Sequence, residues 1–353
     1  MDILNNTIIT YDSIKACVDA NNKEIDNYSV KMGDLLFQRS SETLEDVGRA
    51  NVYMDEKPAI FGGFVIRGKK KGEYNPLFFK NLLETPFSRR KIIPMGAGAQ
   101  HFNIGQEGLS KVKLYFAPIN EQNKIAKILS LLDDRISTQN KIIEDLKKLR
   151  SAISKHLFER RDLLGTKIKL SKVAELKNGY AFQSSKYNSL GEWKIITITN
   201  VTGERYIKEN DCNCILEIPN DIQKHQKLKA NDVLISLTGN VGRVSLCTEG
   251  LFLLNQRVGL LQLKVSEDRE YIYQALSSHK FENSMIACAQ GAAQMNIGKG
   301  DVENYILPYS FNRKNISIVA SILRAYDKYI INETNLQSIL HIQKQYLLRQ
   351  MFI

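Results

Sequence analysis

The sequence predicts an α+β chain with two repeated units of short strands and helices, joined by two long helices that form an antiparallel coiled coil. Two observations support this fold class. Apolar residues in 123–158 recur at steps of three, four or seven, which is the heptad spacing of a coiled-coil helix. The same pattern returns 194 residues later, and short motifs before each helix repeat in the same order.

Each predicted long helix presents an apolar stripe, the seam, to the other helix. Polar residues interrupt it at Gln139 and Arg150 in the first helix and at Glu333 and Lys344 in the second. A polar seam residue costs stability but fixes the register of the partner, so the two helices are expected to pair specifically. The predicted seam residues are Ile125, Leu129, Leu132, Ile136, Ile143, Leu146, Ile153 and Leu157, with Val319, Leu323, Tyr326, Ile330, Leu340, Leu347 and Met351.

Composition narrows the function only slightly. The chain has 353 residues, 43% hydrophobic and 25% charged, which suits two or three domains with real cores. A net charge of +11 favours a nucleic-acid partner, because lysine and arginine neutralise phosphate; a solvated basic surface is the alternative. Five cysteines without a paired CxxC indicate reduced thiols in the cytoplasm. We expect no signal peptide, no membrane span and no bound metal.

The first block, residues 1–120, contains predicted strands at 35–37 and at 60–66, the second with a bulge at its two glycines. Asn75 and Pro76 have the sequence of a helix start, and that helix is expected to reach about Leu83. Residues 111–116 alternate like a strand leading into the first long helix. The predicted domains are 1–120 and 161–312, and the predicted spacer helices are 121–160 and 313–353.

The second block begins after a linker at 159–165 and has predicted strands at 194–198, 233–237 and 258–263 and a helix at 271–284. It repeats the first block. Residues 35–37 match 233–235, 47–49 match 241–243, and the Gly-rich stretch 98–105 matches 291–298. Because the offsets drift by only a few residues, we interpret the chain as a duplication.

An antiparallel helix pair would carry one unit at each end. A helix of 36 to 38 residues spans about 55 Å at about 1.5 Å per residue, comparable to one and a half turns of B-DNA at about 34 to 36 Å per turn. Two such units would contact two short DNA sites separated by unread base pairs. A coiled-coil adaptor whose end units bind proteins is the alternative.

The chain resembles the DNA-specificity subunits of type I restriction-modification enzymes over nearly its whole length. The resemblance rests on residues 119–133, which lead into the first long helix, on Leu157 and Phe158 at its end, on residues 177–182, and on 294–297 with Gly291. It implies two target-recognition domains that each read half of a bipartite site in double-stranded DNA. It also implies that the two spacer helices dock two modification subunits, that restriction/translocase subunits are further partners, and that catalysis belongs to those other chains.

The first block departs from this pattern at its start. Lys167 and Asp232 lie 65 residues apart, whereas Met1 and Asp34 lie only 33 apart. The opening strand and a counterpart of residues 178–182 are therefore expected to be missing. The resemblance is to a specificity subunit with a shortened first target-recognition domain.

An autonomous adenine N6-methyltransferase remains an alternative, because residues 75–78 approach the Asn-Pro-Pro-Tyr/Phe loop that holds a flipped adenine. The second proline is absent, and residues 96–98 make only a partial glycine-rich turn for S-adenosylmethionine. A helix cap explains Asn75 and Pro76 better. We therefore expect no catalytic residue and no cofactor in this chain.

Candidate DNA contacts are basic or amide side chains in turns and at strand ends, since lysines neutralise phosphates and Arg and Asn can bond base edges. Tyr180 could stack on a base, although packing is the simpler interpretation. Residues that differ between the two copies should carry the different sequences read. The candidates are Arg39, Ser41, Arg49, Lys69, Lys70, Lys71, Gln100, His101, Asn103, Tyr180, Thr238, Asn240, Arg243, Gln294, Asn296 and Lys299.

Overall fold

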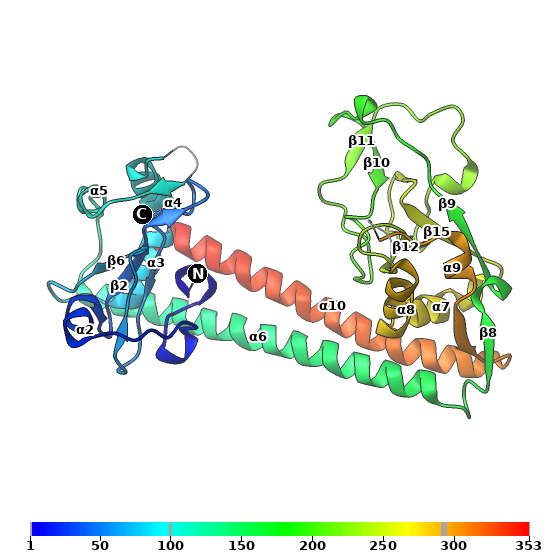
Figure 1. Ribbon diagram of the computed structural model, residues 1–353, viewed down its shortest axis with the longest axis horizontal. Coiled ribbons are helices and arrows are strands. Elements are labelled where there is room, and N and C mark those ends of the chain that lie inside the picture. Colours follow the sequence, from blue (N-terminus) through cyan, green and yellow to red (C-terminus); the bar gives the residue numbers. More distant parts are fainter. Residues whose placement is uncertain (1, 99–100, 291–294, 353) are drawn as a thin grey trace. The chain divides into compact units, whose positions relative to one another are not determined.

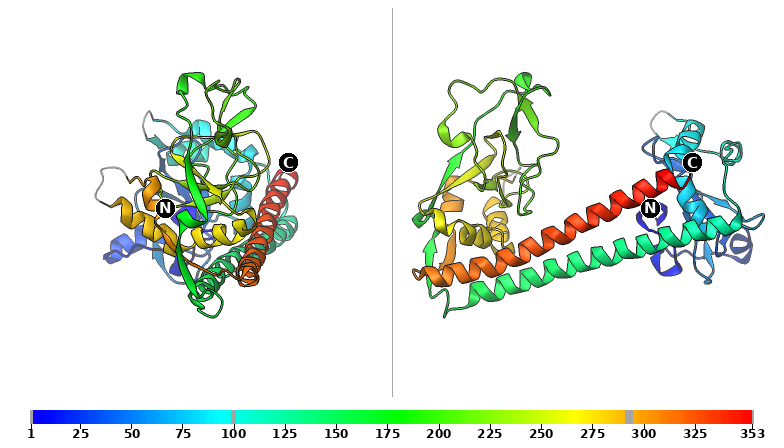
Figure 2. Two further views of the ribbon diagram at one scale, coloured as in Figure 1. Left: turned by 90° about the vertical axis from the view of Figure 1, so that its right-hand side faces the viewer. Right: turned by 180° about the vertical axis from the view of Figure 1, so that it is seen from behind.

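A computed structural model describes residues 2–98, 101–290 and 295–352. The chain divides into two compact units: unit 1 is Met1–Ile142 with Thr334–Ile353, and unit 2 is Ile143–Glu333. Two long helices, α6 (Ile119–Glu159) and α10 (Arg313–Gln350), each contribute residues to both units. Figures 1 and 2 show each of them as one uninterrupted helix. The predicted α+β fold with two long helices is confirmed.

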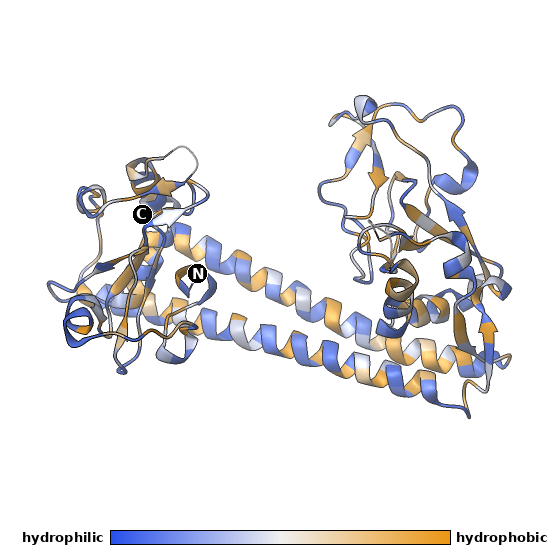
Figure 3. Cartoon of the chain, in the orientation of Figure 1, coloured by the Kyte–Doolittle hydropathy of each residue, from blue (hydrophilic) through white to orange (hydrophobic). Residues whose placement is uncertain are grey.

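The two helices are antiparallel in each unit. In unit 1 the first half of α6 packs on the last turns of α10, where Leu132 and Ile136 contact Leu340. In unit 2 the end of α6 meets the start of α10, and Leu157 shares a core with Val319. Apolar residues recur along both helices between polar ones (Figure 3), as a coiled-coil seam requires.

Unit 1 is built on an antiparallel sheet in the order β4-β2-β6, with β2 (Leu35–Gln38) between β4 (Ala50–Val52) and β6 (Val65–Gly68). Side chains alternate along β2, so Leu35 and Phe37 face a core shared with α4. Leu36 points to the opposite face, into a second core with Ile9 and Tyr53. Its other elements are α1 (Asp2–Asn5), η1 (Tyr11–Ser13), α2 (Asn22–Tyr28), β1 (Ser29–Val30), β3 (Ser40–Ser41), β5 (Ala59–Ile60), α3 (Pro76–Glu84), α4 (Pro86–Ile92), η2 (Ile93–Met95), β7 (Phe102–Asn103) and α5 (Gln106–Ser110).

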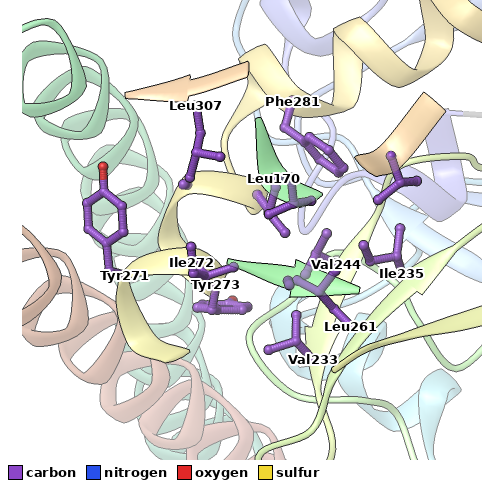
Figure 4. Packing of buried hydrophobic residues seen from close by; sticks show 14 of the residues in the cluster. Leu170, Val233, Ile235, Val244, Leu261, Tyr271, Ile272, Tyr273, Phe281 and Leu307 are labelled. Atoms are coloured by element: carbon purple, nitrogen blue, oxygen red, sulfur yellow. The ribbon is translucent and has the colours of Figure 1, made fainter. Parts of the chain in front are cut away.

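Unit 2 has an antiparallel sheet in the order β13-β12-β15-β9, formed by β9 (Ala174–Asn178), β12 (Val233–Ser236), β13 (Val244–Leu246) and β15 (Val258–Leu263). One face packs against α7 (Arg269–Leu276) and α8 (His279–Ala289). Figure 4 shows Val233 and Ile235 of the sheet in one core with Tyr273 and Phe281 of the helices.

A second sheet of unit 2, in the order β11-β10-β14, shares one core with β12 and β15 of the first sheet and forms a smaller core of its own. Its strands are β10 (Trp193–Ile196), β11 (Asn213–Ile215) and β14 (Phe252–Leu254), with β10 and β14 parallel. The remaining elements are β8 (Thr166–Lys169), η3 (Leu170–Lys172), η4 (Ser184–Lys186), η5 (Lys224–Gln226), η6 (Ser266–Asp268), α9 (Lys299–Glu303) and β16 (Ile306–Tyr309), which pairs with β8.

The repeated sequence motifs form the same hairpin in both units. The Gly48 amide donates to the Gln38 carbonyl at 2.9 Å, and the Gly242 amide donates to the Ser236 carbonyl at 2.9 Å. Both glycines have positive φ, +67° and +78°. A Cβ at either would lie 2.7 Å from a side chain of the covering helix, Ile92 or Met285. Glycine is therefore required at this turn for two reasons: the positive φ and the lack of space for a Cβ.

Three predictions about strands and helices were wrong in detail. Residues 111–116 form no strand: Val112 and Leu114 pack on the core while Tyr115 is exposed, so the alternation reports burial of an extended segment. Residues 60–66 are divided between β5 and β6, which belong to different sheets. The helix expected at 271–284 is two helices, since Ser278 caps α8 by accepting from the Phe281 amide.

The described part of unit 1 contains no strand beside β6, whereas β9 lies beside β15 in unit 2. The three strands β4-β2-β6 otherwise match β13-β12-β15 in order and direction. Of these two matching sheets, the one in unit 1 is thus the smaller.

Candidate nucleic-acid interface

Three loops of unit 2 meet beyond the end of β12. The Leu237 amide donates to the Arg257 carbonyl at 3.0 Å, and the Ile297 amide donates to the Leu237 carbonyl at 2.9 Å. The Thr238 hydroxyl then donates to Asn296 Oδ1 at 3.0 Å. This brings together two of the predicted contact residues, Thr238 and Asn296, from segments 58 residues apart.

These loops surround a polar cavity of about 690 Å³. Gln256 and Arg257 lie on its wall, and both side chains are exposed without a hydrogen bond or ion pair within the described residues. Sequence reasoning missed both. Their position depends on the pairing of β12 with β15, which no local motif reveals. The cavity is lined by Asn178, Gly179, Leu237, Thr238, Gln256, Arg257, Asn296, Ile297, Gly298 and Lys299.

The predicted contact residue Lys299 is already partnered at the cavity edge. Its Nζ lies 2.8 Å from Glu175 Oε1 and 3.6 Å from Glu303 Oε1. Lys177 lies 2.8 Å from the same Glu175 oxygen. Hydrogen bonds from Lys177 and Lys299 lower the pKa of Glu175 to about 2, so this carboxylate offsets part of the local positive charge.

Arg243 and Asn240 lie in the turn between β12 and β13, outside the residues that line the cavity. Arg243 Nε is 3.5 Å from Glu282 Oε1 on α8, whereas Asn240 is exposed. In unit 1 the matching Arg49 has its Nε 2.6 Å from Asp46 Oδ1. Both repeated arginines are therefore held by carboxylates of their own unit.

Unit 1 builds the same strand-end contact from different residues. The Ser40 hydroxyl donates to Asn103 Oδ1, and Ser41 pairs with Phe102 across β3 and β7. The Ile104 amide donates to the Arg39 carbonyl at 2.9 Å, the counterpart of the bond between Ile297 and Leu237.

Two further candidates, His101 and Arg39, lie next to this contact. His101 is exposed, and its carbonyl accepts from Asn103 Nδ2 at 3.3 Å. The Arg39 guanidinium donates to the Gly63 carbonyl at 3.3 Å. Gln100 and Gln294 lie outside the described residues.

Lys69, Lys70 and Lys71 form an exposed basic turn directly after β6. The Lys70 ammonium lies 5.8 Å from the centroid of the Tyr74 ring, and none of the three lysines has an ion pair within the described chain. This turn is available for phosphate contacts.

Tyr180 does not present a free ring. Its hydroxyl donates to Asp221 Oδ1 at 2.8 Å, and its ring centroid is 4.9 Å from that of Phe182. The ring is tied to its own unit, as the packing interpretation expected.

The predicted seam residues pack partly against the other long helix and partly against the core of the unit in which they lie. Ile125 and Leu129 share a cluster with Leu348 of α10 and with Phe352, which follows that helix. The buried residues here are therefore one position beyond the predicted Leu347 and Met351, which are only partly buried. Ile153 and Leu323 belong to the large core of unit 2, and Ile143 is buried. Leu146, Tyr326, Ile330 and Leu347 are half-buried.

The two basic residues that interrupt the seam, Arg150 and Lys344, each form an ion pair with an aspartate that was not among the predicted seam residues. Arg150 Nε is 3.0 Å from Asp327 Oδ1 in unit 2. In unit 1 Lys344 Nζ is 2.7 Å from Asp133 Oδ1. Asp133 and Asp327 are 194 residues apart, the same offset as the seam repeat.

The Asn75 segment has the structure of a helix cap. Asn75 Oδ1 accepts from the Phe78 amide at 3.0 Å, and the Asn75 amide donates to Gln122 Oε1 at 2.9 Å. The first bond caps α3, and the second ties the start of α3 to the start of α6. Within the described residues no three His, Cys, Asp or Glu side chains converge as a metal site, and no helix is apolar over a length that would cross a bilayer.

A sequence model of the type I restriction modification DNA specificity domain matches residues 1–148 and 166–341. The chain belongs to this family. The two matched segments cover most of both units, in agreement with the duplicated hairpin and strand-end contact.

Two proteins of Methanocaldococcus jannaschii are related to this specificity-domain chain. It is 26% identical over 309 residues to the protein named as the type I restriction enzyme MjaX specificity subunit, covering 82% of this chain and 71% of that one. It is 26% identical over 284 residues to the type I restriction enzyme MjaVIII specificity subunit, covering 73% of this chain and 65% of that one.

Two solved structures share the fold. The type I restriction-modification S subunit from M. genitalium aligns over 93% of this chain and 85% of its own, with TM-score 0.58 and 16% identity. A chain from a study of complex assembly and conformational transition of the type I R-M system aligns over 92% and 82%, with TM-score 0.56 and 14% identity. These likenesses show the fold: two α+β units joined by long helices.

Proposed function

We propose that this chain is the DNA-reading subunit of a type I restriction-modification complex. Each unit reads one half of a bipartite site in double-stranded DNA, and the paired helices carry modification subunits. The observation that carries the proposal is the strand-end contact between a hydroxyl and an asparagine, Thr238 to Asn296 and Ser40 to Asn103, which recurs at the same place in both units. The named relatives are specificity subunits, which supports this role.

In unit 2 we assign base contacts to Gln256 and Arg257, with Asn296 beside them. An arginine can form two hydrogen bonds to a guanine edge and a glutamine two to an adenine edge. Their side chains are exposed and have no protein partner within the described residues, so no internal bond has to break before they contact DNA. Arg243 and Asn240 remain candidates, although Arg243 must first leave Glu282.

Phosphate contacts fall to exposed lysines. The turn of Lys69, Lys70 and Lys71 has the charge and exposure for them. Alanine at all three should weaken binding to every sequence and lower the slope of log K against log salt by about 0.9 for each lost contact. A sequence-dependent loss would argue for base contacts instead.

We propose that the chain itself catalyses nothing, and that two modification subunits, with restriction/translocase subunits, supply the chemistry in the cytoplasm. Calorimetry should then detect no S-adenosylmethionine binding to the purified chain, and methylation should require the modification subunit. Binding of the cofactor by the chain alone would favour an autonomous methyltransferase. If the chain assembles with the modification subunit but never changes which DNA is methylated, the adaptor alternative holds.

A further inference from the structure

A groove of about 900 Å³ lies in unit 2 between the last three turns of α6 and the segment where α7 ends and α8 begins. Phe158, Ala275, Tyr305 and Pro308 provide apolar lining. On α6 the lining runs from Lys147 to Glu159, roughly 18 Å at about 1.5 Å per residue. None of these residues belongs to the strand-end contact described above.

The duplication shows what is unusual about this groove. Ser154 on its wall corresponds to Leu348, and Phe158 corresponds to Phe352, at the seam offset of 194 residues. In unit 1 Leu348 is only 3% exposed and packs with Phe352 and with Phe78 of α3. Unit 1 therefore fills with leucine a position that unit 2 leaves to a smaller, polar side chain.

Ser154 is 4% exposed, and its hydroxyl has no hydrogen-bond partner among the described residues. A helical serine can usually bond the carbonyl four residues earlier, so an unpaired buried hydroxyl is a real cost to the free chain. A bound molecule that offers an acceptor in the groove would remove that cost.

The rim of the groove is basic. Lys147, Lys155 and Lys280 have no ion pair within the described residues, while Lys148 is 2.7 Å from Glu144. Glu159 is the one acidic residue among those that line the groove. A basic rim over an apolar floor is complementary to a ligand that is both acidic and apolar.

We propose that this groove binds an acidic, amphipathic peptide segment of the modification subunit, an inference that rests on the proposed function. Carboxylates of the segment pair with Lys147, Lys155 and Lys280, its apolar face covers Phe158 and Tyr305, and one polar group accepts from Ser154. DNA would use the lysines but leaves the apolar floor without a role, so the peptide fits the groove better.

The test measures assembly of the full chain with its modification subunit by analytical ultracentrifugation, at about 0.15 and 0.5 M salt. Reversing Lys147, Lys155 and Lys280 to glutamate should weaken the complex at least tenfold at the lower salt and less at the higher salt. A control triple of Lys172→Glu, Lys186→Glu and Lys224→Glu makes the same charge change on exposed unit 2 residues outside the groove. It should assemble like the wild type.

Two substitutions of Ser154 separate filling of the groove from loss of the hydroxyl. Ser154→Leu copies the residue of unit 1 and should weaken assembly about tenfold by occupying the groove. Ser154→Ala should not lower the melting temperature of the free chain, because its hydroxyl has no partner there, yet should weaken assembly severalfold.

The outcomes distinguish the inference from the proposed function. If wild-type chain forms no complex with the modification subunit, the proposed function fails. If the wild type assembles and all groove variants assemble equally well, the groove inference is wrong. If the lysine variants lose affinity for DNA fragments as the free chain while assembly is unchanged, the groove lysines contact DNA and the peptide inference is again wrong.

Discussion

Arg150 of α6 and Asp327 of α10 form an ion pair at 3.0 Å that joins the two long helices inside unit 2. Arg205, from the loop before β11, donates to the second Asp327 oxygen at 2.8 Å and to Glu270 of α7. Gln274 bonds both carboxylates. This network connects the helix pair to α7 and to the loop before β11 in unit 2, and all its charged members have partners, as buried charges require.

Asp327→Ala should therefore destabilise unit 2 strongly. It leaves Arg150 and Arg205 facing each other without their shared carboxylate, and removing one partner of a buried pair costs about 3 to 5 kcal/mol. Urea denaturation followed by circular dichroism measures the loss. The equivalent Asp133→Ala breaks only the single bond to Lys344 and should cost less. Equal losses would mean that the network adds nothing beyond one ion pair.

Leu132→Glu should disrupt helix pairing in unit 1, because it places a charge in the cluster with Ile136 and Leu340. Leu132 is 9% exposed, whereas its neighbour Leu131 is 61% exposed and provides a matched control. We expect Leu132→Glu to cost about 3 kcal/mol or more and to abolish assembly with the modification subunit on gel filtration. Leu131→Glu should leave the stability of the helix pair intact. A Leu132→Glu variant as stable as the wild type would contradict the seam.

Cysteine reactivity should follow burial. Burial, with a smaller contribution from Asp232, raises the pKa of Cys247 to about 12, so its thiol stays protonated at neutral pH. Cys17 and Cys288 are exposed. At pH 8 iodoacetamide should modify Cys17 and Cys288 in the native chain and Cys247 only in denaturant, as measured by peptide mass spectrometry. Rapid native labelling of Cys247 would show that the core around β13 opens.

The sequence predicted best what is local or periodic. The seam follows from spacing, and the cap at Asn75 and the glycine turns at Gly48 and Gly242 follow from short-range backbone needs. The strand expected at 111–116 failed because alternation reports burial but does not supply a partner strand.

The strand-end site was only half predictable. Thr238 and Asn296 were visible because their motifs repeat, but Gln256 and Arg257 enter the site through the long-range pairing of β12 with β15. The partners of Arg243 and Lys299, Glu282 and Glu175, also come from distant segments. A sequence motif can identify a candidate side chain, but the residues that surround it are set by long-range contacts of the fold.

The most direct measurement of the central claim is the base preference of DNA methylation by the assembled complex, with substrates varied one base at a time in each half-site. Arg257→Ala and Gln256→Ala should relax preference at positions of one half-site only, because each lost pair of base-edge bonds is worth about 1 to 3 kcal/mol. Arg243→Ala, measured alongside, shows whether the arginine paired with Glu282 also contacts bases. If the Gln256 and Arg257 variants assemble normally and keep the wild-type preference at every position, the strand-end cavity does not read DNA.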